Sequence, residues 1–132
     1  MIIQKANFSD IAAIKQIADK CKPNVSAHPT WLYYMLSTFS STFIAKYKGI
    51  ILGYMIAFQN PATKSMFVYQ LAVSPKYRLR GIATALLKRL GSKKITLGVR
   101  KFNNDALKFY KKRGFKLVSK NFWFNKMYKL ER

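Results

Sequence analysis

Apolar residues recur at strand spacing in some parts of the chain and at helix spacing in others. The first predicted helix follows Ser9, which is its predicted N-cap. Its apolar face consists of Ile11, Ile14 and Ile17, which recur at helical spacing. A second helix is predicted to begin at Pro29, because proline is favoured at the first helical position. The same patterns predict strands at residues 1–5, 42–47, 50–58, 66–73, 95–99, 115–118 and 122–128, and helices at 81–90 and 104–113.

Turn-forming residues separate these elements. Lys48-Gly49 predicts a hairpin between two strands, and Gly91 and Gly114 are placed to end the two later helices. Helices come before and after a central group of strands, so the order predicts an α/β fold in which helices cover both faces of a sheet. No repeat or Gly/Ser-rich linker interrupts the chain, and we expect residues 1–132 to form a single domain.

The charge balance is strongly basic. Lysine and arginine number 25 against 4 acids, which gives a formal net charge of +21. Such a charge concentrates anionic partners near the protein. Three interpretations stay open: a nucleic-acid-binding surface, a membrane-binding surface, and solvated lysines without a partner. Lysine outnumbers arginine about threefold, which favours general electrostatic attraction over reading of base edges.

Residues that bind metals or form disulfides are scarce. Cys21 is the single cysteine and His28 the single histidine, so no disulfide and no structural metal are expected. No run of eighteen apolar residues appears, and the first five residues lack the pattern of a signal peptide. We therefore expect a cytoplasmic protein with no membrane span.

The first motif follows the strand predicted at 66–73. Arg78-x-x-Gly81-x-Ala83 leads into a helix, and a helix N-terminus offers unpaired N–H groups and the positive end of its dipole to a pyrophosphate. Gly81 has no side chain that would obstruct that approach. The alternative is an ordinary strand–turn–helix with solvated arginines.

A second motif lies downstream, where residues 103–115 read Asn-x-x-Ala-x-x-Phe-Tyr-x-x-x-Gly-Phe. In this order, with a predicted helix and strand between them, the two motifs resemble the two signatures of the GNAT superfamily of acyl-coenzyme A-dependent N-acyltransferases. The resemblance extends over essentially the whole chain, because residues 2–6 and 10–11 also look like the superfamily's first strand and helix.

The resemblance implies an α/β fold with a mixed, mostly antiparallel sheet, a splayed central pair of strands and helices on both faces. It implies acetyl-CoA as the acyl donor, direct attack by an amine in a ternary complex, and Tyr110 as the general acid. A phenol can protonate a departing thiolate, although Tyr110 packing as an ordinary aromatic is the alternative. The cofactor-binding residues implied are Leu71, Ala72, Val73, Arg78, Leu79, Arg80, Gly81, Ile82, Ala83, Thr84, Asn103 and Tyr110.

The general base is harder to assign. Many relatives place a carboxylate on the central strand or beside it, where this chain has Gln70. The chain has few acids, so water and backbone carbonyls are one alternative as proton acceptors. His28, in the loop that borders the acceptor site in the superfamily, is the other candidate for a catalytic role.

The acceptor stays open at this stage. Residues 21–81 are similar to diaminobutyrate acetyltransferases of ectoine synthesis, but those enzymes are acidic, and a diamine needs carboxylates for its second ammonium. A small amino-acid-like amine is the first expectation. Acetylation of a protein amine or an aminoacyl-RNA, guided by the basic surface, is the second. A non-catalytic nucleic-acid-binding module is the third, and the aromatic segment 122–124 allows a homodimer.

Overall fold

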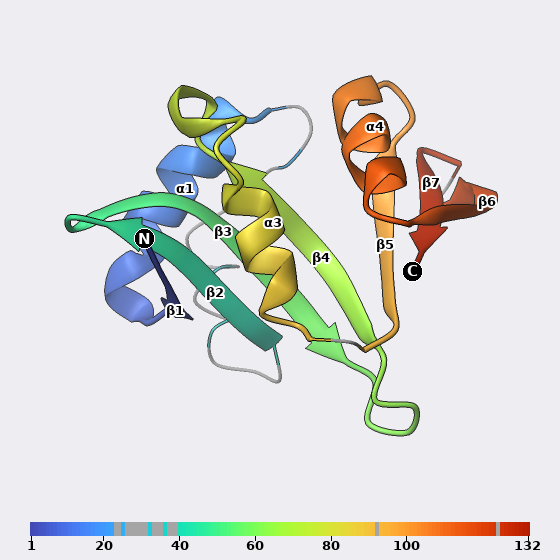
Figure 1. The fold of residues 1–132 in the computed structure, drawn as a ribbon, viewed down its shortest axis with the longest axis horizontal. Coiled ribbons are helices and arrows are strands. Elements are labelled where there is room, and N and C mark those ends of the chain that lie inside the picture. The colour runs from blue at the N-terminus through green and yellow to red at the C-terminus, as the bar shows by residue number, and fades with distance from the viewer. Residues whose placement is uncertain (23–24, 26–31, 33–35, 37–39, 92, 124) are drawn as a thin grey trace.

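A mixed sheet forms the centre of the molecule (Figure 1). The computed structural model describes residues 1–22, 25, 32, 36, 40–91, 93–123 and 125–132. In this part of the chain seven strands follow the order β1-β2-β3-β4-β5-β7-β6, and only the β4–β5 pair is parallel. The strands are β1 (Ile2–Lys5), β2 (Ser40–Tyr47), β3 (Ile50–Gln59), β4 (Met66–Val73), β5 (Ile95–Arg100), β6 (Lys116–Phe122) and β7 (Met127–Glu131). The predicted α/β class and mostly antiparallel sheet are confirmed.

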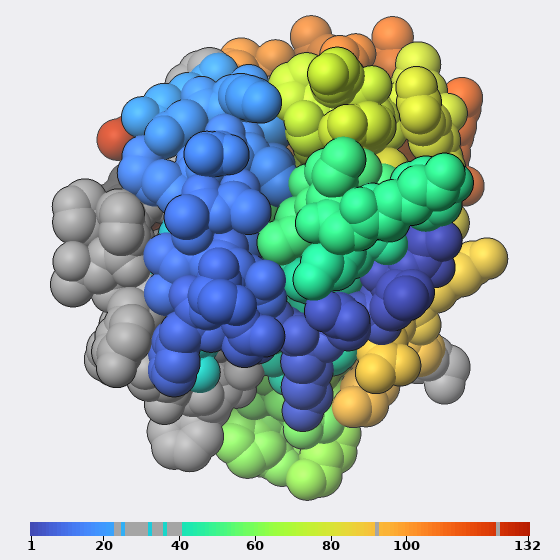
Figure 2. Space-filling model, turned by 90° about the vertical axis from the view of Figure 1, so that its left-hand side faces the viewer, coloured from blue at the N-terminus to red at the C-terminus, as the bar shows by residue number. Residues whose placement is uncertain are grey.

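Helices cover both faces of this sheet. They are α1 (Ile11–Lys20), α3 (Ile82–Lys88) and α4 (Asn104–Lys112), with short 3-10 turns η1 (Phe8–Asp10) and η2 (Pro75–Tyr77). Successive residues of a strand face opposite sides. Met55 of β3 therefore packs with α3 and α4, whereas its neighbours Tyr54 and Ile56 pack with α1. Figure 2 shows the α1 side, with α1 lying beside β1 and the β2–β3 hairpin.

Strands β4 and β5 separate after three paired positions. Their parallel pairing ends at Val68 and Leu97, and the later residues of the two strands do not pair with each other. At the same point β4 contains a β-bulge. Neighbouring residues of β3, Ile56 and Ala57, oppose Gln70 and Val68 of β4, so Tyr69 between them is an extra residue. A β-bulge bends its strand. The bulge therefore accounts for the divergence, which is visible above the middle of the sheet in Figure 1.

Most predicted elements are present, but two details of the prediction were wrong. The helix entrance is capped by Asn7, not Ser9: the Asn7 side chain accepts from the Ser9 N–H at 3.0 Å, and Asp10 Oδ2 accepts from the Asn7 N–H at 2.9 Å. The predicted last strands, 115–118 and 122–128, are in fact β6 and β7. Positive φ angles at Trp123 (51°) and Asn125 (62°) place the turn inside the aromatic run. The helix predicted from Pro29 begins outside the described residues.

We expect Gly53→Ala to destabilise the fold. A methyl group on Gly53 would lie 2.9 Å from the Ala72 carbonyl oxygen and 3.3 Å from the Val73 Cα, both backbone atoms of β4 that cannot move without disturbing the strand. Overpacking of this kind costs about 1–3 kcal/mol, measured by chemical unfolding. Gly49→Asn in the exposed hairpin turn is the control, since asparagine tolerates its φ of +79°. Equal stabilities of the two variants would contradict this account of the β3–β4 contact.

Candidate functional site

Two adjoining cavities, together called the cleft, lie where the strands diverge. One part, which we call the β5 cavity, has a volume of about 270 Å³ and is bounded by the ends of β5, β7 and the middle of β4. The other, the α3 cavity, has a volume of about 470 Å³ and lies between the end of β4, the loop before α3, and α4. Both are lined by Val25, Leu71, Asn103, Ala106 and Tyr110. These shared residues join the two cavities.

The structure gathers the residues of the first motif at the α3 cavity. Of the twelve predicted cofactor contacts, all but Arg80 line this cavity. The Arg80 guanidinium instead lies over the Tyr77 ring, 5.6 Å from its centroid. Arg80 therefore contributes positive charge near the loop without forming the cavity wall.

The loop before α3 has an unusual backbone. Leu79 adopts φ +63° although its side chain is fully exposed, so no packing contact explains that conformation. Gly81 has φ +79°, and a Cβ there would meet nothing within 4 Å. The first helical bond of α3 runs from the Ala85 N–H to the Gly81 carbonyl at 3.0 Å. The backbone N–H groups of residues 82–84 are thus outside the helical ladder, as expected at a helix start.

Arg78 connects this loop to the neighbouring strand and helix. Its Nε donates to the Val73 carbonyl at 3.2 Å, and its Nη2 lies 3.3 Å from the Cys21 sulfur. The Cys21 thiol also donates to the Val73 carbonyl, at 3.6 Å. These contacts fix the end of β4, where the cleft begins.

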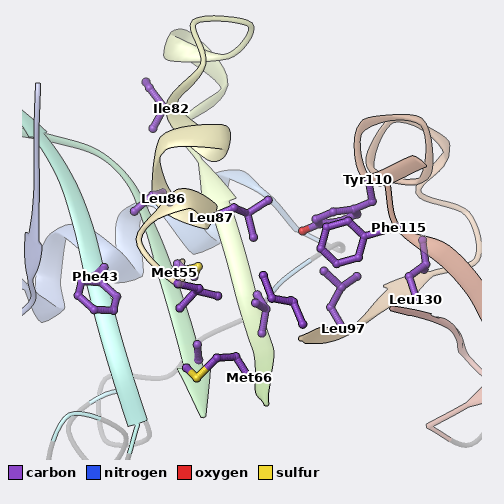
Figure 3. Packing of buried hydrophobic residues seen from close by; sticks show 14 of the residues in the cluster. Phe43, Met55, Met66, Ile82, Leu86, Leu87, Leu97, Tyr110, Phe115 and Leu130 are labelled. Atoms are coloured by element: carbon purple, nitrogen blue, oxygen red, sulfur yellow. The ribbon is translucent and has the colours of Figure 1, made fainter. Parts of the chain in front are cut away.

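The second motif forms the opposite wall. Asn103 is the N-cap of α4, and its Oδ1 accepts from the Ala106 N–H at 3.2 Å. Tyr110 lies two turns further along the same helix and lines both cavities. Its ring meets those of Phe109 and Phe115 edge to face, with centroids 5.1 and 5.2 Å away. Figure 3 shows its hydroxyl directed toward the gap between β4 and β5.

Burial determines the protonation state of Tyr110. Loss of contact with water raises the pKa of the phenol well above its ordinary value, and the positive charge of Arg113 opposes this shift only in part. The hydroxyl therefore stays protonated at neutral pH and can donate a proton.

Two arginines in the cleft were missed by the sequence prediction. Arg113 donates from Nε to Thr84 Oγ1 at 2.8 Å, which ties α4 to α3 at the α3 cavity. Arg100 lines the β5 cavity with its guanidinium over the Trp123 ring, 4.9 Å from the centroid. Hydrophobic periodicity shows which face of a strand is buried, but it gives no indication of where the sheet divides.

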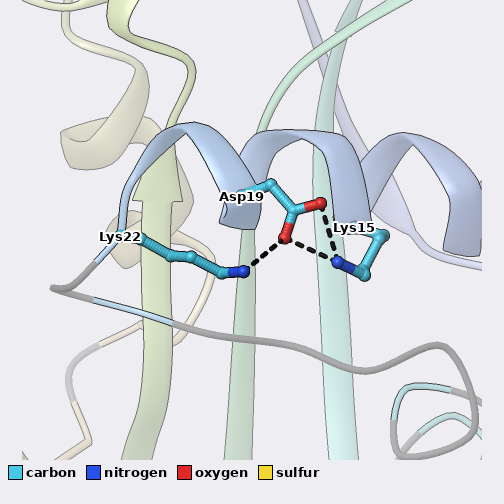
Figure 4. Close-up of polar contacts among 3 residues, drawn as sticks. All are labelled: Lys15, Asp19 and Lys22. Atoms are coloured by element: carbon cyan, nitrogen blue, oxygen red, sulfur yellow. Dashed lines mark hydrogen bonds and ion pairs between the residues drawn. The ribbon is translucent and has the colours of Figure 1, made fainter.

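No carboxylate is found among the described residues that line the β5 cavity. Asp10 caps η1, Asp19 is held between Lys15 and Lys22 (Figure 4), and Glu131 pairs with Lys94 at 2.7 Å. Gln70 lines the cavity, and its Oε1 accepts from the Tyr54 hydroxyl at 2.8 Å. The fourth acid, Asp105, lines the α3 cavity. His28, the other candidate base, lies outside the described residues.

Comparison with known proteins identifies the family. Residues 11–115 match the Acetyltransferase (GNAT) family. An L-2,4-diaminobutyric acid acetyltransferase of Vibrio parahaemolyticus is 33% identical over 92 residues, which are 67% of this chain and 50% of that protein. The chain thus aligns with half the length of this relative. An N-alpha-acetyltransferase of Sulfurisphaera tokodaii is 28% identical over 88% of this chain and 80% of its own length.

The fold comparison agrees. The crystal structure of Ard1 from Thermoplasma volcanium superposes with a TM-score of 0.81 at 19% identity, covering 99% of this chain and 95% of that one. The chain therefore belongs to the GNAT family, which uses acetyl-CoA as the acyl donor. The family membership predicted from the two motifs is confirmed. In the described residues, no helix has the length and apolar character needed to cross a membrane.

We expect Tyr54 and Tyr110 to stay un-ionised until the protein unfolds in alkali. Burial raises the pKa of both phenols above the ordinary value near 10. The folded state therefore loses stability as pH rises above about 10, because the unfolded chain releases these protons first. A titration of phenolate absorbance should show late steps that coincide with unfolding and shrink in Tyr54→Phe and Tyr110→Phe. If the absorbance steps that disappear in these variants came before unfolding, the claim that the two phenols are buried would be contradicted.

Proposed function

We propose that this chain transfers the acetyl group of acetyl-CoA to the primary amine of a small amino-acid-like molecule. The observation that carries the proposal is the pair of adjoining cavities where β4 and β5 diverge, both of which Tyr110 lines. The amine would attack the thioester carbonyl directly: one C–N bond forms, the C–S bond breaks, and the thiolate leaves.

The α3 cavity suits the acyl donor. Coenzyme A carries an anionic pyrophosphate and an amide-containing arm. Arg78, the amides at the start of α3 that lie outside the helical ladder and the side-chain-free Gly81 suit the pyrophosphate. The edge of β4 at residues 71–73, which β5 does not pair, suits the amides of the arm. Asn103 uses its Oδ1 to cap α4, so its amide nitrogen is the group available to the arm.

Tyr110 is assigned as the general acid. Its buried phenol is protonated at neutral pH and points into the gap where the thiolate would depart. The departing thiolate accepts the proton; because its thiol has an ordinary pKa near 8.5, below that of the buried phenol, relative acidity does not favour this transfer. Positioning next to the sulfur, rather than a large difference in acidity, would drive the transfer.

A side-chain carboxylate is not required for the opposite proton transfer. Gln70 is a neutral amide and cannot take a proton from an ammonium at neutral pH. The β5 cavity is lined by cationic Arg100, which favours the neutral form of an amine bound beside it. After attack the nitrogen is cationic and loses a proton to water, which backbone carbonyls can orient by accepting hydrogen bonds. His28 remains the alternative base.

The size of the β5 cavity favours a small acceptor. Its volume of about 270 Å³ is just below the range of about 300–1,000 Å³ typical of small-molecule sites. The relative from Vibrio parahaemolyticus, named as an acetyltransferase of L-2,4-diaminobutyric acid, supports this class. The relative from Sulfurisphaera tokodaii, an N-alpha-acetyltransferase, favours a protein N-terminus as the second candidate.

Replacement of the proposed acid gives a direct kinetic test. We expect Tyr110→Phe to lower kcat by about 10²-fold or more, because general acid catalysis contributes about 10²–10⁴-fold. The Kd for acetyl-CoA, measured by calorimetry, should change little. Tyr128→Phe removes the same hydroxyl from a ring outside both cavities and serves as the control. An unchanged kcat in Tyr110→Phe would exclude Tyr110 from the mechanism.

Salt dependence distinguishes the two acceptor classes. At saturating acetyl-CoA, kcat/KM for a small amine should change by less than about threefold between 50 and 200 mM salt, since few charge contacts form. An acidic protein segment or an aminoacyl-RNA would engage many cations and lose orders of magnitude over that range. A steep decline with every active acceptor would favour the macromolecular alternative.

A further inference from the structure

Arg100 carries a buried polar atom that the protein itself does not satisfy. Its Nε is inaccessible to water and has no hydrogen-bond partner among the described residues. Buried polar groups almost always have a partner, because leaving one unpaired costs free energy. Arg100 lines the β5 cavity, as does Tyr110. The Nε atom itself is closed off from that cavity, so a ligand there would meet the rest of the guanidinium.

The surroundings hold Arg100 in a fixed position. Its backbone pairs with Met127 of β7, and its carbonyl accepts from the Asn103 N–H at 2.9 Å. Its guanidinium lies over the ring of Trp123, whose φ of +51° is rare for a bulky residue. Strained backbone that persists in a fold is concentrated at functional sites. The strain at Trp123 places an aromatic wall against the guanidinium.

Among the described residues, no acid pairs with this guanidinium. Only four acids occur in the sequence. Asp10 caps η1, Asp19 is paired with lysines, Glu131 is paired with Lys94, and Asp105 lines the other cavity. The charge of Arg100 is therefore uncompensated inside a cavity where an acceptor must also place its amine.

We propose that Arg100 is a specificity-determining residue that binds a carboxylate of the acceptor, with the acceptor's amine directed toward Tyr110. This inference rests on the proposed acetyl transfer. A guanidinium matches the geometry of a carboxylate with two parallel hydrogen bonds, which a lysine cannot reproduce. A diamine without an acid group would instead meet like charge, because the β5 cavity offers it no carboxylate.

Matched acceptor pairs test this assignment. The amino acids are β-alanine, 4-aminobutyrate and 2,4-diaminobutyrate. Each is compared with its own primary amide, which lacks the negative charge of the carboxylate but has nearly the same size. We expect kcat/KM of the wild type to be about 10- to 100-fold higher for the carboxylate than for the amide, mainly through a lower KM. This ratio corresponds to the free energy of a hydrogen bond between charged groups. Arg100→Gln should lose this preference, and Arg100→Lys should keep part of it. Lys101→Gln, with its ammonium over Tyr128 outside the cavity, is the control.

A binding measurement covers the case in which none of these amines is acetylated. Trp31→Phe leaves Trp123 as the only tryptophan. In this background the carboxylates should saturate a change in Trp123 fluorescence, whereas the amides should not, and Arg100→Gln should abolish the change.

Three results would overturn the inference. They are equal acetylation of carboxylates and amides, a preference that survives in Arg100→Gln, and, where no amine is acetylated, the absence of a carboxylate-specific fluorescence change. The first two leave the proposed acetyl transfer intact, because transfer is observed in both. Failure of acetyl-CoA to bind the wild type would instead contradict the proposed function itself.

Discussion

The separation of β4 from β5 after three parallel pairs is the constraint on which the rest of the site depends. Two adjacent strands in a sheet normally satisfy each other's backbone groups and leave no room between them. Here the bulge at Tyr69 turns β4 away, and β5 continues toward β7 instead. The divergence leaves a strand edge that β5 does not pair and a cleft in the middle of the fold. α4 then brings Asn103 and Tyr110 to that cleft from the other side.

The charge of the cleft follows from where the few acids lie. Three of them serve caps or surface ion pairs, and the fourth is at the α3 cavity, whereas Arg78, Arg100 and Arg113 all reach the cleft. In the proposed function, this cationic site would attract the anionic acyl donor, favour the neutral form of a bound amine and disfavour an acceptor with a second ammonium. The proposal thus gives donor binding, amine deprotonation and acceptor choice one electrostatic cause.

The order of elements, the β2–β3 hairpin and the two family motifs could be predicted from the sequence, because each depends on local spacing. The last hairpin could not. Phe122 and Trp123 belong to a run of aromatic residues typical of a strand, yet the backbone turns at Trp123, a cost that tertiary contacts with Arg100 and β7 must offset. Arg100 was missed for a related reason. Its role depends on which strand edge opens, and that depends on register between segments distant in sequence.

Hydrogen–deuterium exchange with and without acetyl-CoA tests the central claim most directly, namely that the divergent edge of β4 and the loop before α3 bind the acyl donor. At saturating acetyl-CoA, exchange should slow in peptides that cover residues 70–84, and the β6–β7 hairpin at residues 116–131 should change much less. Protection confined to another part of the chain, or no protection at saturation, would contradict the claim that this cleft is the site of acetyl transfer.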